Sequence, residues 1–507
     1  WPCLIGEWIW TKAAFGEGQG SIKQRDDQYF RLYAEDFNAI CRRADCSKED
    51  LLRIRDEGAP SFIKFCVEEI DWSRFGLVGF TIVFQQLLAS LALARALKQR
   101  YPNLPMIVGG ASMEDDIAEE VMRGCPQIDF AHCGDGEISF PEFIRRLYRS
   151  ESMAGLRGVM WKDTHGVQYA GRAPNFVDMN ATPVPDFDEY FYARREGGYE
   201  WSEEAREVML PVEAARGCWW GEKNHCTFCG LNRSGMEFRA KSAQQLIEQL
   251  ESLSSRYGVF QFNAIDNIMA PEYTEHLFGK LAAANSDIKL HYEIRPNFSR
   301  AQLGRMRRGG LHSVQPGIES FSTSVLKTMK KLTTGMRNLE LVKWCTYYEI
   351  NNLYNILVGF PGEVAADFNI QSELIAKIPH LQPPYAIAKA RADRGSPMYT
   401  DPASQEIHRL VPAPCYQFIF PENLFDLTRI SYYFEHETEQ TQWPKERGEL
   451  FARVAAWRQR WQQRPRPYLK YRKGIRSIVI EDGRENSVVT WRYFDEWAAL
   501  YEFCADA

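Results

Sequence analysis

The sequence predicts an α/β protein with an N-terminal doubly wound, Rossmann-like domain, a partial (β/α)6 barrel and a small C-terminal α+β domain. Short apolar strands alternate with helical periodicity over residues 76–148, which is typical of a doubly wound sheet. A second alternation begins near residue 208 and is shorter than the roughly 250 residues of a complete eight-unit barrel. The tail lacks this alternation and predicts short strands between two helices.

The composition is that of a globular protein without a general affinity for polyanions. Hydrophobic residues make up 45% of the 507 residues, and 61 Lys and Arg against 67 Asp and Glu give a net charge of −6. This balance argues against a nucleic-acid partner bound through a broad positive field. Apolar runs are too short for a membrane span, and the start shows no secretion signal, so we expect a cytoplasmic protein.

The first domain is expected at residues 1–155. Residues 1–70 have mostly helical periodicity, and strands are predicted at 76–84, 105–110 and 128–132 with helices at 87–100, 114–123 and 140–148. The strand ends are rich in glycine, which fits either a ligand that approaches the backbone closely or ordinary turns. No strand is predicted in residues 1–60, so either the chain is truncated at its N-terminus or its pattern conceals one.

A linker is expected at residues 156–205, where prolines interrupt the sequence, and the barrel at residues 206–405. Its strands are predicted at residues 208–214, 259–265, 289–294, 313–318, 353–360 and 385–390, with helices at 244–255 and 339–348. Residues 406–507 are interpreted as a substrate- or peptide-interaction region, with a barrel-capping appendage as the alternative. This region contains an aromatic-rich stretch at 418–434, helices at 445–463 and 495–504, and strands at 468–474, 477–480 and 487–493.

Three of the twelve cysteines form a cluster, whereas the other nine are scattered as small buried hydrophobes usually are. Cys218, Cys226 and Cys229 have the spacing C-x7-C-x2-C directly after a predicted strand. Three thiolates in one loop suit a [4Fe-4S] cluster with one iron left open. A zinc site that adds His225 is a weaker alternative, because His225 adjoins Cys226, and unligated cysteines are another.

This segment resembles the radical SAM superfamily, although the commonest spacing there is C-x3-C-x2-C. Its context, RGCWWG followed by HCTFCGLN, is similar to the cobalamin-dependent group that matures ribosomally made peptides (RiPPs). Further segments similar to landmarks of that group occur in the same order, at residues 79–81 (GFT), 85–86 (QQ), 108–111 (VGGA), 133–137 (CGDGE), 238–242 (FRAKS), 317–320 (GIES) and 354–363 (YNILVGFPGE).

The resemblance implies three cofactors: a [4Fe-4S] cluster on Cys218, Cys226 and Cys229, S-adenosylmethionine (SAM) on the open iron, and cobalamin in the first domain. For SAM, position and chemistry suggest Phe228, Gly230, Asp266, Asn267, Glu293, Arg295, Gln315, Glu319, Ser320 and Gly359. An ion pair between Glu293 and Arg295, and a helix cap at Asp266 and Asn267, are the structural alternatives.

For cobalamin, the small residues at the strand ends of the first domain are the candidates: Thr81, Gln85, Gly109, Gly110, Ala111, Gly134, Gly136 and Glu137. The D-x-H-x-x-G motif, whose histidine ligates cobalt in many cobalamin domains, does not occur in the sequence, and the surroundings of His132 do not match it. No residue is assigned a catalytic role.

The implied activity is C-methylation of an unactivated carbon in a ribosomally made precursor peptide, using a 5′-deoxyadenosyl radical and methylcobalamin. The expected partners are that peptide, through its leader, and an external one-electron donor such as flavodoxin or ferredoxin, with no nucleic acid and no membrane. Cyclisation, epimerisation or oxidation of the peptide is one alternative. A non-catalytic iron–sulfur sensor or electron-transfer protein is the other.

Overall fold

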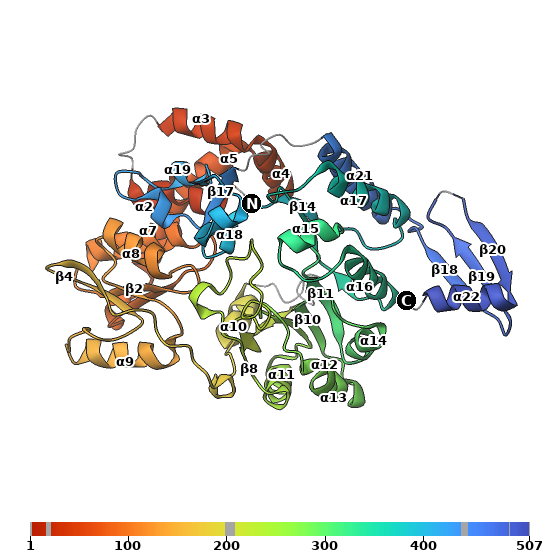
Figure 1. The fold of residues 1–507 in the computed structure, drawn as a ribbon. Helices are drawn as coiled ribbons and strands as arrows, with labels where there is room; N and C mark the ends of the chain where they lie inside the picture. The colour runs from red at the N-terminus through yellow and green to blue at the C-terminus, as the bar shows by residue number, and fades with distance from the viewer. Residues whose placement is uncertain (1–2, 17–21, 198–207, 438–444, 486, 506–507) are drawn as a thin grey trace. The chain divides into compact units, whose positions relative to one another are not determined.

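The computed structural model describes residues 3–16, 22–197, 208–437, 445–485 and 487–505 (Figure 1). The chain forms two compact units, Trp1–Val177 with Leu410–Glu435, and Asp178–Arg409 with His436–Ala507. Among the described residues, no helix is both long and apolar enough to cross a membrane. The units differ from the expected domains, because residues 410–435 belong to the first unit and residues 178–205 to the second.

The sheet of the first unit has the order β1-β2-β3-β4-β5. Strands β1 (Val78–Thr81), β2 (Met106–Gly109) and β3 (Phe130–His132) are parallel, and β4 (Val159–Asp163) and β5 (Gly166–Tyr169) form an antiparallel hairpin beside β3. The three predicted strands are confirmed. The doubly wound prediction is wrong for the described strands, because their order never reverses, and the hairpin is a strand pair that we assigned to the linker.

Helices α7 (Leu87–Arg100), α8 (Asp115–Gly124) and α9 (Gly136–Tyr148) follow the three parallel strands, as predicted. The N-terminal region is helical, also as predicted, with α1 (Ile5–Trp8), α2 (Thr11–Phe15), α3 (Ile22–Leu32), α4 (Ala34–Ala44), α5 (Lys48–Arg53) and α6 (Ala59–Glu69). Residues 410–435 join this unit because their aromatic side chains Tyr416, Phe418, Phe420 and Phe425 are buried in its core.

The second unit contains the parallel strands of the partial barrel. The strands are β6 (Leu210–Val212), β9 (Gln261–Ala264), β10 (Lys289–Ile294), β11 (Leu311–Pro316), β13 (Asn355–Val358) and β14 (Ala386–Lys389). They pair in chain order, and a parallel bridge from Glu319 to Ile356 connects the segment after β11 to β13. All six predicted barrel strands are therefore present, with one further short strand, β12 (Asn351–Asn352), beside β11.

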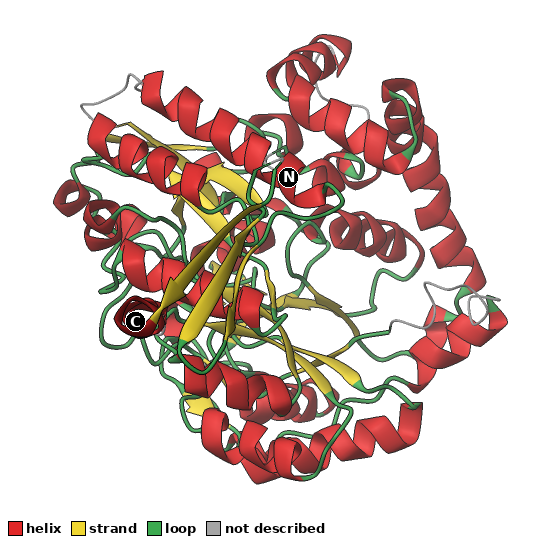
Figure 2. Cartoon of the chain, turned by 90° about the vertical axis from the view of Figure 1, so that its right-hand side faces the viewer, coloured by secondary structure: helices red, strands yellow, loops and turns green. Residues whose placement is uncertain are grey.

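Helices flank these strands (Figure 2). They include α11 (Ala243–Tyr257), α14 (Arg300–Arg308), α16 (Gly335–Tyr347) and α17 (Ala365–Lys377). The later helix α21 (Lys445–Gln462) packs on α17, and its Trp457 donates a hydrogen bond from Nε1 to the Leu381 carbonyl oxygen at 3.0 Å. The barrel core is thus completed by a segment that lies far along the chain.

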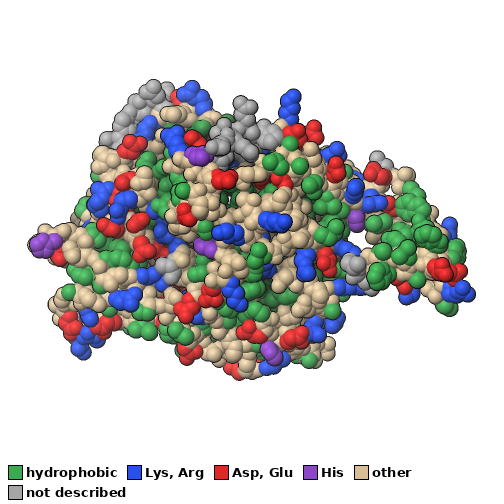
Figure 3. Space-filling view, viewed as in Figure 1, with side chains coloured by type: hydrophobic (Ala, Val, Ile, Leu, Met, Phe, Trp, Pro, Cys, Tyr) green, Lys and Arg blue, Asp and Glu red, His purple; other side chains and the backbone are tan. Residues whose placement is uncertain are grey.

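The chain ends in a small antiparallel module made of β18 (Leu469–Lys473), β19 (Ser477–Asp482), β20 (Val489–Phe494) and α22 (Asp495–Ala505). This confirms the predicted strands and final helix. Within the described residues, the outer edges of β18 and β20 pair with no other strand. Large apolar side chains gather on the surface of the module (Figure 3), among them Ile475, Phe494, Trp497, Leu500 and Phe503.

Candidate metal centre

The cysteine cluster lies in a loop whose root is closed by two short strands. β7 (Ala215–Arg216) and β8 (Arg239–Ala240) pair antiparallel and hold the two ends of the loop together. Gly217, at φ +77°, follows β7, and a Cβ there would lie 2.1 Å from the Glu237 carbonyl oxygen. Only glycine fits this position, because both the backbone angle and the space exclude a side chain. The Cys218 amide then donates to the Met236 carbonyl oxygen at 3.0 Å.

Within the loop, local hydrogen bonds set the backbone around the three thiols. The Gly221 amide donates to Cys218 Sγ at 3.3 Å, and the Cys229 amide donates to the Cys226 carbonyl oxygen at 3.1 Å. The His225 ring hydrogen-bonds the Cys229 carbonyl through Nε2 at 2.8 Å, and burial lowers its pKa. His225 therefore braces the turn between the last two cysteines, which leaves Nε2 unsuited to a fourth metal ligand.

The donor set fits an iron–sulfur cluster. Among the described residues, no three His, Cys, Asp or Glu side chains stand close enough to hold a single metal ion. A cluster does not require that convergence, because each thiolate binds a different iron. Burial raises the pKa of the Cys226 thiol, and it raises the pKa of the Cys229 thiol to about 12. Ligation must therefore displace protons from buried thiols.

Two buried cations face these thiols. Arg295, 8% exposed, stacks its guanidinium over the Trp220 ring at 3.4 Å and donates from Nη2 to the Lys331 carbonyl oxygen at 2.8 Å. Lys331, 6% exposed, forms an ion pair from Nζ to Glu319 Oε1 at 3.2 Å. Both positive charges lower the pKa of the Cys226 thiol, against the larger effect of burial. This site can therefore stabilise negative charge on the cysteine sulfurs.

Our sequence analysis missed Lys331. Although burial alone would lower the pKa of Lys331, the negative charges of Glu319 and Cys226 together outweigh burial and raise the pKa above its ordinary value. The exposed Lys330 precedes it and has the same side chain, so nothing local distinguishes the two lysines. The only usable signal was its position shortly after the GIES segment.

Several predicted SAM-binding residues come together near the ends of β10 and β11. Gln315 donates from Nε2 to Glu293 Oε1 at 3.3 Å. Burial raises the pKa of Glu293 to about 7, and the charge of Glu319 adds to that effect. Glu319 has a φ of +56° and is fixed by its bridge to Ile356. Among the described residues, Glu293 and Arg295 form no ion pair with each other, so that structural alternative is not observed.

Other predicted SAM-binding residues form hydrogen bonds with other residues of the chain. Ser320 is fully buried, and its hydroxyl donates to Gln371 Oε1 at 3.1 Å. Asp266 accepts two backbone amides, and Asn267 donates from Nδ2 to Asn232 Oδ1 at 2.8 Å. The Gly359 amide donates to Glu363 Oε2 at 2.6 Å.

The remaining two predicted SAM-binding residues belong to the cysteine loop. The Phe228 ring packs edge-on against Phe360 at 5.7 Å, which covers the end of the Cys226–Cys229 turn. Gly230 directly follows Cys229 and is buried. Both residues therefore lie beside the thiols, as their positions in the sequence require.

The predicted cobalamin residues lie at the strand ends of the first unit. Thr81, the last residue of β1, and Ala111, two residues after β2, are exposed there. A Cβ on Gly109 would meet its nearest neighbour at 3.5 Å, an ordinary contact, so packing within the unit does not demand glycine. These three positions fit a ligand that approaches the backbone.

Other predicted cobalamin residues serve the packing of the unit itself. Gln85 Oε1 accepts the Gly6 amide at 2.8 Å. A Cβ on Gly110, at φ +102°, would lie 2.6 Å from the Ile82 carbonyl oxygen, and one on Gly134, at φ +98°, 3.1 Å from the Ala173 carbonyl oxygen. Gly136 begins α9 and is followed by Glu137 in its first turn. The amides of Leu87 and Leu88, which begin α7, are accepted by the carboxylate of Glu7 at 3.0 and 2.7 Å.

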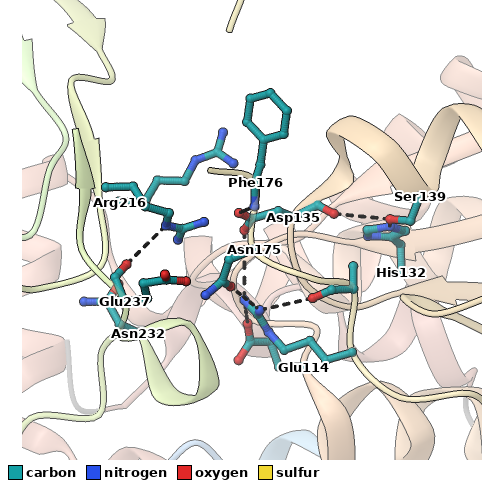
Figure 4. Close-up of polar contacts among 12 residues, drawn as sticks. Glu114, His132, Asp135, Ser139, Asn175, Phe176, Arg216, Asn232 and Glu237 are labelled. Carbon is teal, nitrogen blue, oxygen red and sulfur yellow. Dashed lines mark hydrogen bonds and ion pairs between the residues drawn. The ribbon is translucent and has the colours of Figure 1, made fainter. Parts of the chain in front are cut away.

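His132 also forms a hydrogen bond within this unit (Figure 4). Its Nε2 hydrogen-bonds the Ser139 hydroxyl at 2.7 Å, and burial lowers its pKa. Nearby, Asp135 Oδ2 accepts the Phe176 amide at 2.8 Å, which ties the segment after β5 to the end of β3 (Figure 4). These contacts agree with the absence of a cobalt-ligating histidine motif from the sequence.

The barrel region matches a known family. Residues 212–370 match the model of the radical SAM superfamily. The chain is 24% identical to an uncharacterized methyltransferase of Pyrococcus horikoshii over 64% of this chain and 71% of that protein. It is 22% identical to cytidylyl-2-hydroxyethylphosphonate methyltransferase of Streptomyces wedmorensis (51% of this chain, 53% of that one). It is 23% identical to the cobalamin-dependent radical SAM methyltransferase TokK of Streptomyces tokunonensis (55% of this chain, 41% of that one).

The alignments thus span about half, or less, of the last two relatives. Two solved structures have a similar fold. The radical SAM methyltransferase TsrM from Kitasatospora setae, with cobalamin and a [4Fe-4S] cluster bound, gives a TM-score of 0.57 at 15% identity over 79% of this chain and 83% of that one. The cobalamin-dependent radical SAM enzyme OxsB, with aqua-cobalamin bound, gives 0.58 at 13% identity over 79% and 65%.

The radical SAM domain implies a [4Fe-4S] cluster and SAM. The chain therefore contains a radical SAM domain, and its fold resembles that of TsrM, solved with cobalamin bound, and of the cobalamin-dependent enzyme OxsB.

Proposed function

We propose that this chain is a cobalamin-dependent radical SAM methyltransferase that methylates an unactivated carbon. The carrying observation is a loop with three cysteines at the end of the first barrel strand, faced by the buried cations Arg295 and Lys331. The names of the relatives support methyl transfer. One is called a cytidylyl-2-hydroxyethylphosphonate methyltransferase, and another a cobalamin-dependent radical SAM methyltransferase. The fold shared with TsrM and OxsB supports cobalamin as the second cofactor.

In this proposal Cys218, Cys226 and Cys229 would hold the cluster. When bound, the cofactors supply a carbon radical on the substrate and the methyl group that it receives. The chain supplies the surroundings. Arg295 and Lys331 balance negative charge on the thiolates, and Phe228 with Phe360 shields the loop from water. Glu319 holds the Lys331 ammonium in place through their ion pair.

Glu293 and Gln315 are proposed as partners for hydroxyl groups of SAM. With a pKa of about 7, the Glu293 carboxyl is divided between its protonated and ionised forms near neutral pH. It can therefore either donate a hydrogen bond to a sugar oxygen or accept one from a sugar hydroxyl. Gln315 fixes the orientation of the carboxyl by donating to Oε1.

For the substrate, we propose a ribosomally made precursor peptide. The support is the resemblance of the cysteine segment, together with a C-terminal module that leaves two strand edges unpaired within the described residues. An extended leader can add a strand to such an edge, with Trp497 and neighbouring apolar side chains as contacts. The Streptomyces wedmorensis relative is named for a cytidylyl-2-hydroxyethylphosphonate, and TsrM was solved with tryptophan as its substrate.

The first experiment measures cofactors and cleavage on the full chain under anaerobic conditions. Iron, sulfide and hydroxocobalamin are supplied, and SAM and a strong reductant are added. We expect about four irons and one cobalt per chain, with release of 5′-deoxyadenosine and S-adenosylhomocysteine. Cys226→Ala should abolish both products, whereas Cys504→Ala, which alters an exposed cysteine outside the loop, should keep them.

Each alternative has its own result. Deoxyadenosine without S-adenosylhomocysteine would favour a non-methylating modification of the substrate. Four irons without any SAM cleavage would favour a sensor or electron-transfer protein. Deoxyadenosine without bound cobalt would remove cobalamin from the proposal.

The peptide is tested separately with SAM that carries a labelled methyl group. The reconstituted chain is incubated with the peptide fraction of a cell extract, and the products are treated with protease. Label that protease converts to small fragments supports a peptide substrate. Label in protease-resistant small molecules contradicts it while leaving methyl transfer intact.

A further inference from the structure

Asp266 follows β9 and is deeply buried, with 2% of its surface exposed. Its Oδ1 accepts the amides of Ala214 and Ala215, each at 2.8 Å. Its Oδ2 is buried and has no hydrogen-bond partner among the described residues. One carboxylate oxygen thus receives two amides from adjacent residues, so Asp266 already binds the backbone of its own chain.

The two amides belong to the root of the cysteine loop. Ala215 begins β7, and Cys218 follows this strand after a single glycine. The root therefore stands between the barrel strand and the first thiol. Gly217 packs closely against the Glu237 backbone, which leaves little space for it to move. A shift of the root is therefore expected to move the Cys218 backbone as well.

The segment that leaves the loop is hydrogen-bonded to the strand that enters it. The Lys241 amide donates to the Ala214 carbonyl oxygen at 2.8 Å, which joins the strand entering the loop to the segment leaving it. The Tyr273 hydroxyl donates to the Lys241 carbonyl oxygen at 2.8 Å. Lys241 is itself buried and donates from Nζ to Gln249 Oε1 at 2.6 Å. Asp266 and Tyr273 together hold both ends of the loop.

We propose that Asp266 is a positioning residue that fixes the root of the cysteine loop, and that it is not a SAM ligand. The proposal rests on the proposed function only in that the loop holds the cluster. The contacts at the root are made by the chain's own residues, so they can be tested on the chain without iron.

The test compares Asp266→Ala, Asp266→Asn and Asn267→Ala in the iron-free full chain. The rate of alkylation of each loop cysteine by iodoacetamide is followed by peptide mass spectrometry under anaerobic, non-denaturing conditions. We expect Asp266→Ala to speed alkylation of Cys218 at least tenfold. Asp266→Asn should stay within about threefold of the unaltered chain, because the amide oxygen still accepts both N–H groups. Asn267→Ala removes a contact to Asn232 within the loop and none at the root, so it should change the Cys218 rate much less than Asp266→Ala does.

The second measurement is iron content and binding of S-adenosylhomocysteine after reconstitution. We expect Asp266→Ala to lose at least half of its iron, while the chains that do hold iron bind S-adenosylhomocysteine with unchanged affinity. Unchanged alkylation and iron with a tenfold loss of affinity would overturn the proposal and make Asp266 a ligand contact.

If Asp266→Ala does not fold, as judged by near-ultraviolet circular dichroism, Tyr273→Phe decides. This variant removes only the hydroxyl, which donates to the Lys241 carbonyl oxygen at the outgoing end and, at 3.3 Å, to the Ala214 carbonyl oxygen at the incoming end. We expect a two- to fivefold faster alkylation of Cys218. An unchanged alkylation rate of Cys218 in Tyr273→Phe would contradict a clamp at the root. Failure of the unaltered chain to bind iron would end the proposed function, yet the alkylation rates would still test the role of Asp266.

Discussion

The carboxyl ends of the parallel strands are used differently in the two units. In the first unit, Gln85 and Gly110 serve contacts within the unit, and Glu7 covers the start of α7. In the second unit, buried cations lie near the loop of cysteines: Arg295 directly follows β10, and Lys331, in the segment before α16, pairs with Glu319. Both edges are equally rich in candidate residues by sequence. A glycine at a strand end is therefore a weak sign of a ligand site, because close backbone packing also requires glycine, whereas a buried cation beside thiols has a cost that needs a partner.

The largest effect is expected from Lys331→Met in the second unit. The substitution removes the buried partner of an ion pair and leaves Glu319, whose side chain is only 17% exposed, without it; breaking a buried pair costs about 3–5 kcal/mol of unfolding free energy. Iron incorporation should also fall, because one of the two cations facing Cys226 is lost. Chemical denaturation of the iron-free chain and iron analysis measure the two effects. Lys330→Met, on the exposed neighbour, is the control and should change neither quantity.

A second prediction concerns the dependence of stability on pH. Burial raises the pKa of Asp266 to about 7, so between pH 4 and 7 the folded chain keeps a proton that the unfolded chain releases. Stability from this group is therefore full below pH 4 and is lost as the pH rises to 7, by up to about 4 kcal/mol. Denaturation at pH 5 and pH 8 should show a smaller difference for Asp266→Asn than for the unaltered chain. Equal differences would contradict a raised pKa.

In the first unit, the pKa shift of His132 makes stability depend on pH in the opposite direction. Burial lowers the pKa of His132, so the folded chain binds its proton less readily than the unfolded chain. Its contribution to stability is present above pH 6.5 and is lost as the pH falls below that value. His132→Gln should therefore reduce the acid sensitivity of the first unit without altering the effect of Asp266.

The next prediction tests the packing role of glycine in the first unit. Gly110→Ala forces a Cβ into the Ile82 backbone at a φ of +102° and should cost about 2–3 kcal/mol of unfolding free energy. Gly171→Ala is the matched control, since it also has a positive φ but no neighbour within 4 Å, and should cost about 1 kcal/mol. Equal costs would show that the backbone angle alone requires glycine.

The smallest change in stability is expected for Gly109→Ala, where a Cβ meets only ordinary contacts. Its unfolding free energy should stay within about 0.5 kcal/mol of the unaltered chain. Cobalamin retained after gel filtration should nevertheless fall at least threefold if the corrin approaches this backbone. Unchanged retention would remove Gly109 from the proposed cobalamin site.

Local patterns predicted much of the fold. The six barrel strands, the helices α7 and α21 and the C-terminal module lie where their apolar periodicity indicated. The short strands β4 and β5 were assigned to a linker, because four or five residues give too short a periodic pattern to distinguish from a loop. Helix and strand periodicity reports on a residue's near neighbours, so it cannot show which distant strands pair.

The sequence by itself determined the cysteine loop, the barrel class and the helical N-terminus, because each follows from the order and spacing of nearby residues. Only the tertiary structure decided that residues 410–435 belong to the first unit, that Lys331 faces Cys226, and that Asp266 holds the root of the loop. These contacts join residues far apart in the chain. Their partners are selected by burial and by the need to satisfy polar groups in the folded core, which no local pattern records.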